Sequence, residues 1–148
     1  MNNQFRHTDT NKANGLHIQW AMILLDDDTA DAPDERDEGF WPSHDPDAAG
    51  FVGGDAATFA AAEDAAAERM SAWRNGDWRY VGVVAEARCL VVSNGVGTYY
   101  TLKSAGCWGV ESDAGDYLND LFAEEKAALA ADLKTLGTEP ASDMNVAA

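Results

Sequence analysis

Carboxylates are the side chains whose number and spacing in this sequence could carry chemistry. The 148 residues include 26 Asp and Glu against 10 Lys and Arg, which gives a formal net charge of −16. A protein this negative repels nucleic acid and anionic membranes, so its charged partners are cationic, either a basic protein surface or a metal ion. The composition therefore predicts no direct contact with nucleic acid or with a membrane.

The densest group of acids lies between residues 26 and 47, where ten acidic residues accompany a single base, Arg36. Three prolines in the same stretch favour a long and partly mobile loop, which we place at 26–54. We expect this acidic loop to contribute to partner binding. Its candidate residues are Asp26, Asp27, Asp28, Asp31, Glu35, Asp37 and Glu38.

A second group of acids, Asp113, Asp116, Asp120 and Glu124, recurs at steps of three and four residues. On a helix such side chains lie about 5–6 Å apart, near the phosphate spacing along a strand of DNA. The ladder therefore predicts a DNA-mimicking surface that binds a basic, nucleic-acid-binding protein. The alternative is an acidic accessory or structural protein without mimicry, whose charge serves solubility or adapts it to a salt-rich host.

An enzymatic interpretation rests on Asp77, Glu86 and Arg88, which resemble the Asp…Glu-x-Lys arrangement of metal-dependent nucleases. Glu86 and Arg88 would share one face of a strand, but Arg replaces Lys and does not readily lose a proton. The first aspartates of the acidic loop lack EF-hand spacing, and the two cysteines and three histidines lack zinc-ligand spacing. We predict no catalysis, cofactor or metal, and keep a metal-dependent nucleic-acid or small-molecule enzyme as the alternative.

The elements that would position these residues follow from apolar periodicity and turn signals. The predicted strands span 16–25, 78–92 and 98–103, with a short one near Cys107, and the predicted helices span 55–76 and 113–136. This order predicts an α+β fold, with an antiparallel sheet of three or four strands and both helices packed on one face.

The chain length fits one domain, which we place at 16–137. We expect a flexible arm at 1–15 before it and a disordered tail at 138–148 after it. The first residues lack the apolar run of a signal peptide, and no apolar run approaches the roughly 20 residues that cross a bilayer. The sequence thus predicts a cytoplasmic protein.

Three stretches resemble a known family, and the likeness covers roughly the second half of the chain, starting near Glu68. They are Gly76-Asp77-Trp78-Arg79-Tyr80-Val81-Gly82-Val83, then Ser104-Ala105-Gly106-Cys107-Trp108-Gly109-Val110-Glu111-Ser112-Asp113, then the closing acidic helix that ends in Leu136-Gly137. Together they are similar to small acidic proteins from phages and other mobile elements, although Cys107 stands where an aliphatic residue is expected. The resemblance implies a phage or mobile-element setting inside a host cell. It transfers no catalytic residues, because none are assigned in that family. Combined with the charge, it predicts a counter-defence protein that blocks a host CRISPR or restriction effector.

The second of these stretches also has a structural interpretation. Trp108 is expected to fill the space between the sheet and a helix. Glu111, Ser112 and Asp113 are expected to cap the N-terminus of the last helix, where carboxylates and a hydroxyl accept hydrogen bonds from free N–H groups. The alternative is a carboxylate site in which Glu111 and Asp113 bind a metal or a basic partner.

Overall fold

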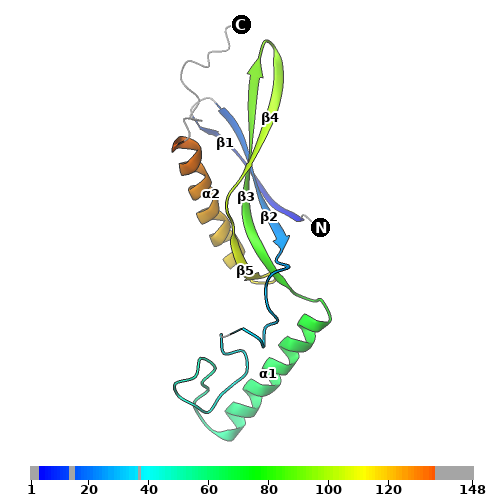
Figure 1. Cartoon of the computed structure of the whole chain (residues 1–148), viewed down its shortest axis with the longest axis vertical. Helices are drawn as coiled ribbons and strands as arrows, with labels where there is room; N and C mark the ends of the chain where they lie inside the picture. Colours follow the sequence, from blue (N-terminus) through cyan, green and yellow to red (C-terminus); the bar gives the residue numbers. More distant parts are fainter. Residues whose placement is uncertain (1–3, 14–15, 37, 136–148) are drawn as a thin grey trace. The chain divides into compact units, whose positions relative to one another are not determined.

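The structure is a computed structural model that describes residues 4–13, 16–36 and 38–135. These residues form, in chain order, β1 (Gln4–Ala13), β2 (Leu16–Asp26), α1 (Ala56–Arg74), β3 (Tyr80–Ser93), β4 (Val96–Lys103), β5 (Cys107–Glu111) and α2 (Tyr117–Thr135) (Figure 1). The predicted α+β class with an antiparallel sheet is confirmed. The tail predicted at 138–148 lies outside the described residues.

The described chain divides into two compact units. The sheet unit contains the residues up to Asp27 and those from Tyr80 onward, and therefore holds all five named strands and α2. The inserted unit, Asp28–Arg79, contains α1 and most of the predicted acidic loop. The range 16–137, predicted as one domain, thus includes the whole inserted unit and part of the sheet unit.

The sheet has the order β1-β2-β3-β4, and β5 also pairs with β3. β4 pairs with β3 from Glu86 to Ser93, whereas β5 pairs with β3 from Tyr80 to Val83. The two strands therefore follow one another along β3. The hairpin between β3 and β4 turns at Asn94-Gly95, and both residues have positive φ, at 51° and 76°. Asn-Gly favours this left-handed pair, which suits the twist of a two-residue hairpin.

Strand β1 differs from the prediction of a flexible arm. It pairs antiparallel with β2 from Gln4↔Leu24 to Ala13↔Leu16. The segment lacks the apolar alternation by which a strand is recognised in a sequence. It can form a strand without that alternation, because an edge strand can be stabilised by main-chain hydrogen bonds. The signal that sequence reasoning underused is Asn14-Gly15, because exactly two residues separate the last pair and Asn-Gly is the strongest short hairpin signal.

The core of the sheet unit lies between the sheet and α2 (Figure 1). Alternate residues of β2 and β3 point toward it, as the period of two predicts. Their partners are apolar residues of α2 at helical spacing. The buried cluster includes Ile18, Trp20, Met22, Leu24, Val81, Val83, Ala85, Ala87, Cys89, Val110, Leu118, Leu121, Phe122, Leu129 and Leu133. Each large member contributes about 1.5–3 kcal/mol through burial of apolar surface.

The inserted unit is built around α1, whose predicted ends are confirmed. Asp55 is the N-cap, and its carboxylate accepts hydrogen bonds from the backbone N–H of Thr58 at 2.9 Å and from the Thr58 hydroxyl at 2.8 Å. The helix ends at Arg74, and Gly76 follows with a φ of 78°. Beyond it, the Trp78 indole donates to the carbonyl of Arg69 at 3.1 Å, and the Arg69 guanidinium lies 3.8 Å from the ring centroid.

The segment 28–54 contains no helix or named strand in its described residues, as predicted, but part of it is organised by backbone contacts. The N–H of Ser43 donates to the carbonyl of Gly50 at 2.8 Å, and the N–H of Val52 donates to the carbonyl of Ser43 at 3.0 Å. The chain approaches itself closely here, since a Cβ on Gly50 would lie 2.2 Å from the carbonyl oxygen of Trp41. The ring of His44 stacks on Phe59 of α1 with centroids 3.7 Å apart.

Candidate partner-binding surface

The predicted helical ladder of carboxylates is shorter than expected. Helix α2 begins at Tyr117, so Asp120 and Glu124 lie on it one turn apart, whereas Asp113 and Asp116 precede it. The later start of the helix has a local cause. The N–H of Ala114 donates to the carbonyl of Glu111 at 3.1 Å, and Gly115 has a φ of 61°, which a right-handed helix does not allow.

The same geometry corrects the predicted cap of this helix. Glu111 is the last residue of β5, and Ser112 and Asp113 lie in the turn that follows. Hydrogen bonds at the start of the helix instead reach the carbonyl of Gly115, which accepts from Leu118 at 3.2 Å, and the carbonyl of Asp116, which accepts from Asn119 at 2.9 Å and Asp120 at 3.3 Å. The predicted cap at Ser112 or Asp113 was therefore wrong by one turn of helix.

The outer face of α2 carries few charges after Glu124. Positions three, seven and eight residues beyond Glu124 are Ala127, Ala131 and Asp132, and all three are exposed. After Asp120 and Glu124, the row at helical spacing thus continues with two alanines and one acid, Asp132. However, the whole segment 111–124 is acidic, because its five acids are all exposed and it contains no base. These acids are Glu111, Asp113, Asp116, Asp120 and Glu124.

Two other acids of the sheet unit hold the fold together. Glu125, half-buried on α2, accepts a hydrogen bond from the N–H of Gly106 at 2.9 Å and so attaches the β4–β5 connection to the helix. Asp27 accepts a hydrogen bond from the N–H of Gly109 at 3.0 Å, which joins the end of β2 to β5. Asp26, the last residue of β2, is exposed and pairs with Val81 in the sheet. Asp26 and Asp27 were both predicted to bind a partner, and Asp27 makes a hydrogen bond within the fold.

The remaining candidates lie in the inserted unit. Asp28, Asp31, Glu35 and Glu38 are exposed, while Asp37 lies outside the described residues. The base of the acidic stretch, Arg36, forms an ion pair with Glu38 at 2.7 Å. Most of the charge in this stretch therefore faces solvent, as expected of a surface that could meet a cationic partner.

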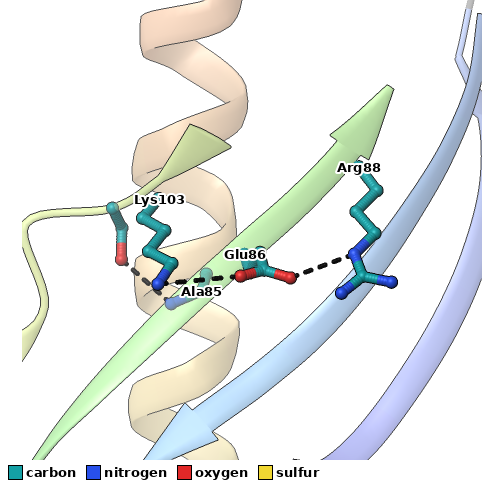
Figure 2. Close-up of polar contacts among 5 residues, drawn as sticks. Ala85, Glu86, Arg88 and Lys103 are labelled. Carbon is teal, nitrogen blue, oxygen red and sulfur yellow. Dashed lines mark hydrogen bonds and ion pairs between the residues drawn. The ribbon is translucent and has the colours of Figure 1, made fainter. Parts of the chain in front are cut away.

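Two residues of the enzymatic hypothesis, Glu86 and Arg88, form an ion-pair network with Lys103 on β3 and β4 (Figure 2). The predicted shared face of Glu86 and Arg88 is confirmed, because the Arg88 Nε lies 3.2 Å from the Glu86 Oε1. The Lys103 Nζ lies 3.8 Å from the other carboxylate oxygen. Glu86 is only 5% exposed, and its register pairing with Ala21 places it on the sheet face opposite α2.

The third residue of the enzymatic hypothesis, Asp77, lies in a different unit from the other two. It belongs to the inserted unit, whereas Glu86 and Arg88 belong to the sheet unit. Among the residues that the structure describes, no group of three or more His, Cys, Asp or Glu side chains is arranged to hold a metal ion. Each oxygen of the Glu86 carboxylate faces a basic group, which is the arrangement of a buried structural ion pair.

The two cysteines are free thiols. Cys89 is buried in the core, and its burial raises the pKa of the thiol because the charged thiolate is disfavoured away from water. Cys107 is half-buried on β5.

The prediction that Trp108 fills the space between the sheet and a helix was wrong. It is 47% exposed, and its indole N–H donates to the carbonyl of Ala105 at 3.0 Å. The ring lies directly against Gly82 of β3, where an added Cβ would come within 2.5 Å of it. Gly82 therefore provides the flat site on which the indole rests.

Sequence reasoning missed a region without acids. From residue 87 to residue 110 the chain contains no Asp or Glu, although 26 acids occur in the whole sequence. This acid-free segment includes Arg88, Lys103 and the exposed tyrosines Tyr99 and Tyr100. The gap between acids could have been found by reading charge as a pattern along the chain.

No helix in the described part of the chain is both long and apolar enough to cross a membrane. Comparisons with known proteins find no family model, no curated protein and no solved structure that matches this chain.

Proposed function

We propose that this protein is a non-catalytic binding protein that blocks a basic, nucleic-acid-binding protein through its exposed carboxylates. The observation that carries the proposal is the segment 111–124, with five exposed acids and no base. Carboxylates concentrated in this way create a local negative potential that attracts a cationic surface and repels polyanions.

Mimicry of nucleic acid follows from what such a partner recognises. Proteins that bind DNA or RNA contact phosphates mainly with Lys and Arg, and this contact supplies much of their affinity. Asp120 and Glu124 lie one turn apart on α2, a spacing at which the Cβ atoms of helical residues are about 5–6 Å apart. Asp113 and Asp116 extend the acidic segment before the helix. A partner that binds these carboxylates with its phosphate-binding surface can no longer bind nucleic acid there.

The resemblance to small acidic phage and mobile-element proteins supports a class of target. In that setting, the basic partner is a host defence complex that binds DNA or RNA, such as a CRISPR or restriction effector. The site of action is then the cytoplasm of the host cell.

The direct test is displacement of labelled duplex DNA from purified CRISPR and restriction effectors, followed by fluorescence anisotropy. We expect the protein to displace DNA from its target effector, and the displacement to weaken as salt rises from about 50 mM to about 500 mM. The variant Asp116→Asn, Asp120→Asn and Glu124→Gln should weaken displacement at least about tenfold, because it removes three charges from the contact.

A matched variant separates local charge from net charge. Glu63, Asp64 and Glu68 are exposed on α1, so Glu63→Gln, Asp64→Asn and Glu68→Gln remove the same charge from the inserted unit. Equal weakening by both variants would show that net charge acts without a defined surface. Failure to displace DNA from any effector would refute the counter-defence function and favour the accessory-protein alternative.

A further inference from the structure

Strand β4 has an open edge. Among the described residues it pairs only with β3, and no other strand lies against its outer side. Its apolar and aromatic side chains are strongly exposed, at 66% for Val96, 64% for Tyr99 and 58% for Tyr100. Such an edge offers a row of backbone N–H and C=O groups to any extended strand that can approach.

The sequence of β4 has no residue that protects the edge except the last one, Lys103. Proteins usually protect an edge with charges, proline or a bulge. From Val96 to Leu102 there is no charged residue and no proline, and the pairing with β3 has an unbroken register. The opposite edge, β1, contains charged residues along its sequence and has a register shift between Phe5 and His7.

The distribution of charge allows a second copy of the chain to approach the β4 edge. A second copy of this chain carries the same charge of −16, so its acidic surfaces repel the first copy. The acid-free segment 87–110 adds nothing to this repulsion at the contact itself, because it has no Asp or Glu and has two bases, Arg88 and Lys103. β4 lies wholly within this segment, so two copies can approach each other there.

The hairpin is also accessible beyond its neighbour. β2 pairs with β3 as far as Leu90, whereas β4 continues to pair with β3 out to Ser93 (Figure 1). The tip of the β3–β4 hairpin therefore extends past the end of β2.

We propose that β4 pairs antiparallel with β4 of a second copy, so that a homodimer forms around one continuous sheet. A two-fold axis pairs the strand with itself, as closed dimers require. Tyr99 and Tyr100 point to opposite faces of the strand, so each face of the new strand pair receives a tyrosine from both copies. This inference does not depend on the proposed function.

The test combines sedimentation equilibrium with amide hydrogen exchange. We expect the fraction of dimer to rise with protein concentration up to about 1 mM. It should also rise with salt, because screening weakens repulsion between two acidic chains. Amide exchange in Val96–Lys103 should slow as the dimer forms, while exchange in α1 should not change with concentration.

Variants locate the contact. Val96→Lys with Tyr99→Lys places like charges on the open edge and should raise the dissociation constant at least about tenfold. Ala61→Lys with Ala65→Lys changes the net charge equally at exposed positions of α1 and should leave dimerisation unchanged. A protein that stays monomeric, or a dimer without slower exchange in β4, would overturn the proposal. If the β4 variant fails to fold, exchange in the wild-type chain alone decides.

Discussion

At the scale of single residues, Glu86 is the acid whose environment differs most from the rest. It is buried and faces Arg88 and Lys103, whereas the five acids of segment 111–124 are exposed. A buried carboxylate is tolerated because the opposite charges offset the cost of taking it out of water. Its role in this structure is to stabilise the sheet face opposite α2.

The first prediction concerns this ion pair. Arg88→Met keeps a long apolar side chain but removes a charge from Glu86, so we expect the free energy of unfolding to fall by about 1–2 kcal/mol, since the pair is partly solvated. Chemical denaturation at neutral pH measures it. Arg74→Met, at an exposed position at the end of α1, is the control and should have little effect. Equal stability of the two variants would contradict a structural role for the network.

At the scale of elements, the cap of α1 gives a prediction that depends on pH. Hydrogen bonds from the backbone N–H and the hydroxyl of Thr58 lower the pKa of Asp55 below its ordinary value of 3.8. The charged cap therefore stabilises the folded state fully above the ordinary aspartate pKa, and this stabilisation is lost as pH falls through the lower folded value.

We accordingly expect Asp55→Ala to lower the thermal midpoint at pH 7 by a few degrees. The difference from wild type should shrink as pH falls below the ordinary aspartate pKa and through the lower folded value, where the wild-type cap also becomes protonated. Asp55→Asn is the control, because asparagine caps helices without titrating. A wild-type advantage that persists undiminished at low pH would argue against the charged cap.

The elements also show what could be predicted from the sequence. Period-two alternation identified β2 and β3, and the Asp55 and Gly76 signals identified both ends of α1, because these features are local. The start of α2 was missed because Gly115 turns the chain after β5, which neighbouring residues do not reveal. β1 was missed because an edge strand needs little apolar surface. The prediction of a four-residue ladder of carboxylates was wrong for the same reason, because it assumed that the helix begins at Asp113.

At the scale of the whole molecule, the net charge of −16 opposes compaction. Salt screens this repulsion, so we expect the thermal midpoint to rise by a few degrees between about 20 mM and about 300 mM NaCl. Calorimetry should use the Val96→Lys with Tyr99→Lys variant, in which dimerisation is weakened, because dimer formation would also raise the midpoint. A midpoint that falls with salt would mean that attractive ion pairs outweigh the repulsion.

The path of the chain between the two units has an architectural consequence. The N–H of Asp27 donates to the carbonyl of Tyr80 at 3.0 Å, so the chain leaves the sheet unit and returns to it at one point. β2 and β3 are antiparallel neighbours, and residues 28–79 therefore occupy the place of an ordinary hairpin turn. In modular terms, the inserted unit is a cassette: a two-residue turn in its place would leave a continuous meander, and a foreign domain with adjacent termini could be grafted there.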